Sequence, residues 1–206
     1  MTAIAMASKR RLLLPAILLL ILVVAAGGFW AWRAITSVPP PPAVAADGLP
    51  NGFKPVDPPL AMGDLAFQDV DGKTVRLSDF HGQPVLLNIW AKWCAPCLEE
   101  MPKLNHLQRD VAPGTLAVVA VAVDEPNPLK VRDFLANRRW DALTPYLDPK
   151  NVFADALNIK SIPVSLLIDK NGFALVRVDA PVDWFSDGAI RLLKQTIMSD
   201  AGSASQ

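Results

Sequence analysis

The sequence predicts one α/β domain that follows a single transmembrane helix. Two observations predict the domain: apolar segments after residue 60 run in the order strand, helix, strand and then strand, strand, helix, and two cysteines lie where a predicted strand meets a predicted helix. A third observation predicts the membrane helix, because residues 12–32 carry no charge over 21 residues, enough for roughly 30 Å of hydrocarbon. We expect the domain at 60–199, about 140 residues around one core.

The first half of the domain is predicted from the spacing of its apolar residues. Segment 67–77 indicates an opening β-hairpin. β-Branched and aromatic residues at 85–90 indicate a short buried strand. At 97–111 apolar residues recur at helical spacing, and Glu100 is among the charged residues that we expect largely on other faces. The apolar run 116–123 indicates a second strand.

The second half closes the domain with three helices and a hairpin. A proline that suits a first helical turn opens the helix predicted at 128–138. A shorter helix is predicted at 152–157. Strands at 164–168 and 174–178 flank a Lys-Asn-Gly turn and read as a hairpin. The closing helix at 184–198 places its apolar residues along one face.

Cys94 and Cys97 are the chain's two cysteines, and their placement indicates thiol–disulfide exchange. Cys94 lies at a helix N-terminus, where unpaired N–H groups and the helix dipole stabilise a thiolate. Cys97 lies one turn further and can resolve a mixed disulfide. A structural disulfide, two inert thiols and a zinc site completed by His81 and His106 are competing interpretations. A Cu(I)-handling variant of the pair stays open. We expect no metal or cofactor.

Several motifs carry a resemblance to a known family. Residues 88–97, NIWAKWCAPC, match the pattern NxWAxWCxPC, and 100–102 match an ExP element on the next helix. Residues 161–163 resemble a cis-proline loop, and residues 164–172 resemble the strand and tight turn that come after such a loop. In this order the motifs resemble the thioredoxin superfamily, and more narrowly the bacterial membrane-anchored TlpA/ResA-like proteins, over roughly 60–198.

The resemblance implies a thioredoxin fold with an N-terminal β-hairpin and a helical insertion, and the activity of a protein-disulfide reductase. Cys94 and Cys97 would form the redox-active disulfide. Pro163 would be the cis-proline, which places the backbone of residue 162 where an extended partner segment can pair with it. Trp93 and Ile162 would then contact the substrate beside the sulfurs.

The resemblance also raises the question of the proton acceptor. Classical thioredoxins carry a buried acid where this chain has Asn88, so the acceptor must lie elsewhere. Glu125 resembles in position an acid that some relatives place beneath the resolving cysteine, where it could deprotonate Cys97. Asp124 is the nearby rival. Val164 replaces the threonine that many relatives carry after the cis-proline.

The N-terminal region predicts the location of the domain. Basic residues at 9–11 precede the apolar run and only Arg33 comes closely after it, which keeps 1–11 in the cytoplasm and sends the domain across the membrane. We expect 12–32 to be an uncleaved anchor in the inner membrane. A cleaved signal peptide, ending near the small residues at 43–45, and twin-arginine export are alternatives.

Residues 33–59 are rich in proline and predict an extended, mostly unpacked spacer between anchor and domain. At the ~3.1 Å per residue of polyproline II the spacer would reach up to about 80 Å. We expect residues 200–206 to form a flexible tail.

The charge and the cysteine content limit the classes of molecule that the chain is expected to bind. Twenty basic and twenty acidic residues cancel, which argues against nucleic acid as a partner. With no third cysteine, the pair needs an external redox partner, such as a membrane thiol donor. The resemblance favours a periplasmic reductant of client proteins in cytochrome c or cytochrome oxidase (copper centre) maturation. A disulfide oxidant, or a copper-handling or scaffold protein, is the alternative.

Overall fold

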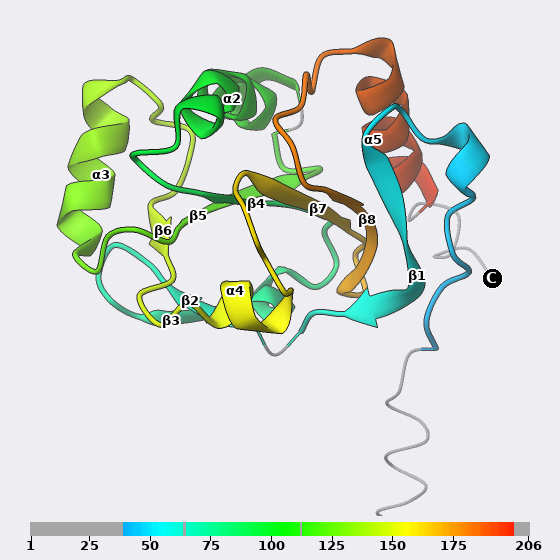
Figure 1. Cartoon of the computed structure of the whole chain (residues 1–206), viewed down its shortest axis with the longest axis horizontal. Coiled ribbons are helices and arrows are strands. Elements are labelled where there is room, and N and C mark those ends of the chain that lie inside the picture. The colour runs from blue at the N-terminus through cyan, green and yellow to red at the C-terminus, as the bar shows by residue number, and fades with distance from the viewer. Residues whose placement is uncertain (1–38, 64, 112, 200–206) are drawn as a thin grey trace, which may run out of the picture. The chain divides into compact units, whose positions relative to one another are not determined.

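Within the part of the chain that the structure describes, an eight-stranded mixed sheet lies at the centre (Figure 1), in the strand order β1-β8-β7-β4-β5-β6-β2-β3. The structure is a computed structural model that describes residues 39–63, 65–111 and 113–199. Its strands are β1 (Phe53–Ala61), β2 (Ala66–Gln68), β3 (Thr74–Arg76), β4 (Val85–Trp90), β5 (Ala117–Ala122), β6 (Tyr146–Leu147), β7 (Val164–Ile168) and β8 (Phe173–Val178). Its helical segments are η1 (Ala46–Gly48), η2 (Leu77–Phe80), α2 (Ala95–His106), η3 (Leu107–Val111), α3 (Pro128–Asn137), α4 (Val152–Ala156) and α5 (Asp187–Ser199).

Strand β4 lies in the middle of the sheet, parallel to β5 and antiparallel to β7. All six of its residues are buried, because helices cover both faces of the sheet (Figure 1). Alternate side chains point to opposite faces. Leu86 and Trp90 pack in the core beneath α2, α3 and α5, whereas Leu87 and Ile89 pack in the core that includes Phe153 of α4. This arrangement fixes the C-terminal end of β4 directly before the two cysteines.

The elements predicted from the apolar spacing are present in the predicted order. The predicted α/β order and the N-terminal hairpin, formed by β2 and β3, are confirmed. The closing helix begins at Asp187 rather than at residue 184, because the preceding residues form a loop in which Trp184 is buried. Val111 is 45 % exposed rather than buried. Val111 is the last residue of the π-helical turn η3, which changes the register of the helix face.

Strand β1 differs from the predicted spacer. Residues 53–61 pair antiparallel with β8, so ordered pairing starts inside the segment 33–59. The prolines at 55, 58 and 59 suggest an unpaired chain, but β1 is the edge strand of the sheet. An edge strand tolerates residues without an N–H donor. The pairing register shifts between Pro55 and Leu60, within which the bond before Pro58 is cis.

Strand β6 is not predicted from the sequence. It contains two residues, pairs in parallel with β5 and antiparallel with β2, and so joins the hairpin to the central sheet. A two-residue strand is too short to have a recognisable period.

The predicted cytoplasmic segment 1–11, the anchor 12–32 and the tail 200–206 lie outside the described residues. Among the residues that are described, no helix combines the length and the apolar character needed to cross a membrane.

Candidate active site

The two cysteines form a disulfide at the start of α2. Cys94 is the N-cap residue of the helix, and the N–H of Cys97 donates to Cys94 Sγ at 3.3 Å. Both residues are buried, at 4 % and 1 % exposure. β4 ends at Trp90, and α2 begins a few residues later. Pro96 favours this start of the helix, because it lies in the first turn, where its missing N–H costs little. The N–H groups and the positive end of the helix dipole therefore face the sulfur of Cys94.

The loop before β7 lies against the same sulfur. The bond between Ile162 and Pro163 is cis, as predicted, and Cys94 Sγ lies 3.7 Å from the carbonyl oxygen of Ile162. Trp93, next to the cysteine, is 72 % exposed. The structure therefore brings together the predicted residues Trp93, Cys94, Cys97, Ile162 and Pro163, and their catalytic and binding roles stay predictions.

Glu100 is the buried acid of the site, and it is 2 % exposed. The indole Nε1 of Trp184 donates to Glu100 Oε1 at 2.5 Å, and Asn88 Nδ2 lies 3.4 Å from Oε2. A backbone hydrogen bond from Val182 also reaches the carboxylate. Burial raises the pKa of Glu100 to about 7, although these hydrogen bonds and Lys103 oppose the rise.

Glu100 lies three residues after the resolving cysteine on α2. Residues three apart on a helix lie on one face, with about 5–6 Å between their Cβ atoms. The Cα–Cβ bonds tilt toward the helix N-terminus, so the side chain of Glu100 leans back toward Cys97. The expectation that Glu100 lies on another face is therefore wrong. The spacing of Cys97, Glu100 and Leu104, all buried, is the signal in the sequence, but a glutamate in a helix is usually solvated.

Glu125 lies among cations instead. Its Oε2 pairs with Lys92 Nζ at 2.5 Å and lies 3.9 Å from Lys130 Nζ, while its Oε1 accepts from the N–H of Asn127. The hydrogen bond from Lys92 is the main cause that holds the pKa of Glu125 below its usual range. A carboxylate paired in this way is a weak proton acceptor. The role that the resemblance implies for Glu125 therefore stays a prediction, and its ion pairs argue against it.

Asp124, the rival acid, supports the active-site loop. Its Oδ2 accepts from the N–H of Lys92 at 3.0 Å. Asp124 and Glu125 together connect the loop before the cysteines to the end of β5 through both the backbone and the side chain of Lys92. These contacts indicate that the two acids position the loop.

The histidines lie in other surroundings. His81 packs against Gly172 of the β7–β8 turn, where a Cβ atom would lie 2.6 Å from the imidazole. His106 pairs with Asp110 and stacks on Phe185. Over 39–63, 65–111 and 113–199 no group of three or more His, Cys, Asp or Glu side chains is arranged to hold a metal ion.

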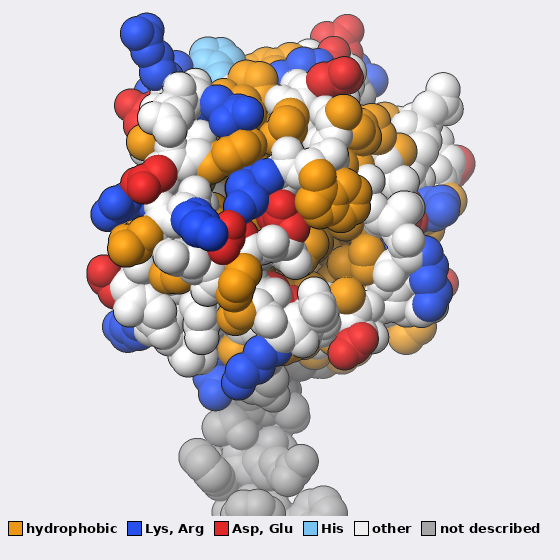
Figure 2. Space-filling model, turned by 60° about the vertical axis from the view of Figure 1, so that its left-hand side comes forward, with side chains coloured by type: hydrophobic (Ala, Val, Ile, Leu, Met, Phe, Trp, Pro, Cys, Tyr) orange, Lys and Arg blue, Asp and Glu red, His pale blue; other side chains and the backbone are white. Residues whose placement is uncertain are grey.

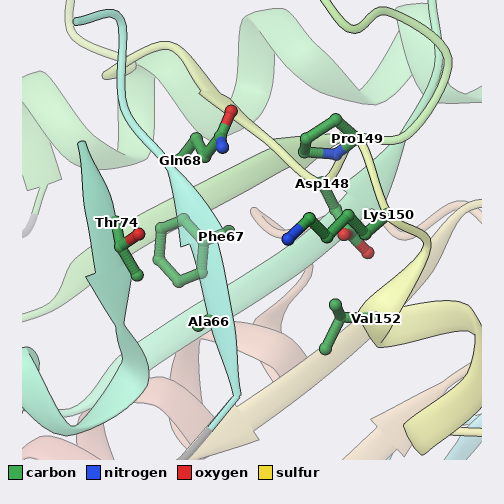
Figure 3. Close-up of a pocket in the computed structure, with 8 residues that line it drawn as sticks. All are labelled: Ala66, Phe67, Gln68, Thr74, Asp148, Pro149, Lys150 and Val152. Carbon is green, nitrogen blue, oxygen red and sulfur yellow. The ribbon is translucent and has the colours of Figure 1, made fainter. Parts of the chain in front are cut away.

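Two cavities of about 160 Å³ each bear on the search for a binding site. The first lies between the β2–β3 hairpin and the start of α4, with Phe67, Asp148 and Lys150 among its lining residues (Figure 3), and it contains none of the site residues. The second is lined by Glu99, Glu100, Lys103 and the segment 181–183, and it lies directly beside the buried acid.

Comparisons with known proteins agree with this geometry. The model of the AhpC/TSA family matches residues 60–175, more than half of the chain. The chain is similar to a thiol-disulfide oxidoreductase ResA of Geobacillus kaustophilus, at 38 % identity over 109 residues, which cover 53 % of this chain and 62 % of the relative. It is also similar to the thioredoxin-like protein YneN of Bacillus subtilis, at 38 % identity over 112 residues, covering 53 % and 64 %. The chain thus spans less than two thirds of the length of these curated relatives.

Solved structures of thioredoxin-like proteins are also similar to this chain. A putative thiol:disulfide interchange protein DsbE of Chlorobium tepidum matches with a TM-score of 0.54 and 31 % identity, covering 68 % of this chain and 94 % of that one. An exposed lipoprotein thioredoxin of Streptococcus pneumoniae matches with a TM-score of 0.54 and 27 % identity, covering 64 % and 98 %.

Proposed function

Because the chain belongs to the AhpC/TSA family of thioredoxin-like proteins, we propose that it is a protein-disulfide reductase that uses Cys94 and Cys97. The observation that carries the proposal is the disulfide at the start of α2, whose outer sulfur lies 3.7 Å from the carbonyl of the residue before a cis-proline. The names of the curated relatives support a thiol–disulfide oxidoreductase.

The first step is attack by Cys94. In the reduced protein, the helix N-terminus favours the thiolate of Cys94 over its thiol. The thiolate attacks one sulfur of a client disulfide, forms a mixed disulfide and displaces the other client sulfur as a thiolate. The exposed ring of Trp93 and the backbone of Ile162 provide a surface for the client segment on either side of the sulfur.

The second step is resolution by Cys97. Glu100 takes the proton of the Cys97 thiol, and the new thiolate attacks Cys94 Sγ and releases the second client sulfur as a thiolate. The client disulfide is reduced by two electrons, and the Cys94–Cys97 disulfide re-forms. Glu100 then returns its proton to water through the cavity that it lines beside Lys103 and Asp183.

The oxidised pair must be recharged. We assign this step to a membrane thiol donor that supplies two electrons, because the chain has no other cysteine. The apolar run 12–32 supports anchoring in the inner membrane with the domain in the periplasm. The resemblance to the TlpA/ResA-like proteins supports clients in cytochrome c or cytochrome oxidase maturation. Proteins are the expected partners, and on the face in Figure 2 basic and acidic side chains are interspersed.

The test compares Cys94→Ser and Cys97→Ser of the full-length protein in an insulin-reduction assay. Loss of the nucleophile should lower turnover by about 10³-fold or more. Cys97→Ser should accumulate a mixed disulfide with the substrate, visible by mass spectrometry. Retained turnover in Cys94→Ser would overturn the proposal.

Direction needs a separate measurement. The redox state of the pair in cells, trapped by acid and thiol-specific mass tags, should be mainly reduced and should become oxidised when the membrane donor is removed. A pair that stays oxidised with and without the donor would indicate an oxidant or a structural disulfide.

A further inference from the structure

Trp184 connects the segment before α5 to the buried acid of the site. The indole is 1 % exposed, and its edge packs against the ring of Phe53 at a centroid distance of 5.8 Å. Its Nε1 donates to Glu100 Oε1 at 2.5 Å, closer than the 3.4 Å between Asn88 Nδ2 and Oε2. A buried indole N–H usually finds a hydrogen-bond partner, and here that partner is the carboxylate of the site.

The contact between Trp184 and Glu100 favours one protonation state of the carboxyl group. An indole nitrogen can donate but cannot accept, so it stabilises the charged form of Glu100 more than the neutral form. Asn88 is held by a second contact, because its Nδ2 also lies 3.0 Å from Ser165 Oγ. The two oxygens of Glu100 are therefore held from two directions, one by the loop before α5 and one by β4.

We propose that Trp184 is a positioning residue for the proton transfer, which holds Glu100 in the orientation that faces Cys97. This inference rests on the proposed function, since it concerns the group that accepts the proton of Cys97. Its consequence is that the last loop of the domain, 84 residues further along the chain than Glu100, sets the pH range in which the resolving step operates.

The other groups around Glu100 leave this role to the indole. Lys103 and Asp183 form an ion pair at 3.0 Å that is exposed on both sides, with side-chain exposures of 43 % and 58 %. Glu99 lines the same cavity. From the sheet, Asn88 and Ser165 present neutral side chains. Besides Cys97 itself, these are the titratable and charged groups that face Glu100 in the described residues.

The experiment tracks the indole N–H resonance of Trp184 in the oxidised full-length protein by ¹⁵N–¹H NMR, from about pH 5 to about pH 9. Trp184→Phe, which keeps a ring and removes the N–H, assigns the resonance. We expect it to titrate with a midpoint near the pKa of Glu100, about 7, and to lose that titration in Glu100→Gln. A resonance that does not move over this range, or that still titrates in Glu100→Gln, would overturn the inference.

A kinetic readout completes the test. In Trp184→Phe the pH midpoint of the resolving step should rise by about one unit, because a hydrogen bond to the charged form is lost. Trp140→Phe, which changes a tryptophan that packs near Phe134, should keep the wild-type profile. An unchanged midpoint in Trp184→Phe would also contradict the inference. The NMR titration needs no client protein. Its result is therefore independent of the insulin-reduction assay that tests the proposed function.

Discussion

Glu100 and Glu125 are two glutamates near one pair of cysteines, and the fold gives them opposite properties. Glu100 lies on α2 at 2 % exposure and is held by an indole and an amide, so burial dominates and raises its pKa to about 7. Glu125 lies after β5 beside Lys92 and Lys130, and the hydrogen bond from Lys92, with a further one from the N–H of Asn127, lowers its pKa. The difference indicates that burial can raise the pKa of a carboxylate toward neutrality even against hydrogen bonds from neutral groups, whereas a cationic partner lowers it.

The comparison predicts its largest effect on the resolving step. Glu100→Gln should slow the release of a client from the mixed disulfide by about 100-fold, because a general base is lost. The matched change Glu125→Gln should leave that rate within about threefold, since it removes only a positioning ion pair. Stopped-flow measurement of release from a preformed mixed disulfide gives both rates.

The pH dependence of the resolving step also distinguishes Glu100 from Glu125. Resolution in the wild type should accelerate as pH rises through about 7, where Glu100 becomes ionised. Equal slowing in the two glutamine variants, or a larger effect of Glu125→Gln, would contradict the assignment of Glu100 as the general base.

A smaller effect is expected on stability. The pKa of Glu100 is raised from 4.5 to about 7 in the folded state, so the folded protein binds this proton more tightly than the unfolded chain. The resulting stabilisation is complete below pH 4.5 and is lost as pH rises to about 7. At ~1.4 kcal/mol per unit this amounts to about 3.5 kcal/mol. Urea unfolding of the oxidised protein at several pH values measures it.

Glu100→Gln is the control for that measurement. It should flatten the decline in the free energy of unfolding between pH 4.5 and 7, whereas Glu125→Gln should keep it. A wild-type protein with no decline in this interval would contradict the burial of an ionisable Glu100.

The smallest effect concerns the ion pair of Glu125. Lys92→Met should lower the melting temperature by a few degrees at most and should make it less sensitive to added salt, because the pair is partly solvated and screened. Calorimetry at low and high salt checks this. A large loss of stability would mean that Lys92 does more than hold the active-site loop.

The strands that form the centre of the sheet could be predicted because their sequence satisfies two conditions at once. β4, β5 and β7 are β-branched or apolar over most of their length and are covered on both faces. β1 could not be predicted, since its prolines are acceptable only on an edge, and position in a sheet is not a local property.

The site residues also fall into two groups, those that local motifs predict and those that they do not. Cys94, Cys97 and the cis bond before Pro163 lie in local motifs, and the structure places them together. The buried Glu100 accepts a hydrogen bond from Trp184, a partner 84 residues away in the sequence. The contact with Trp184 leaves no spacing in the sequence, and the helical spacing of Cys97 and Glu100 alone does not separate a buried glutamate from a solvated one. The resemblance therefore points to Glu125 as the acceptor.

The most direct test measures the two carboxylates themselves, by ¹³C NMR of the side-chain carboxyl carbons of Glu100 and Glu125 as a function of pH. We expect Glu100 to titrate near 7 and Glu125 to titrate below the 4.5 of an ordinary glutamate. Titration of Glu100 near 4.5, or of Glu125 near neutral pH, would contradict the proposal that burial makes Glu100 the proton acceptor of the site.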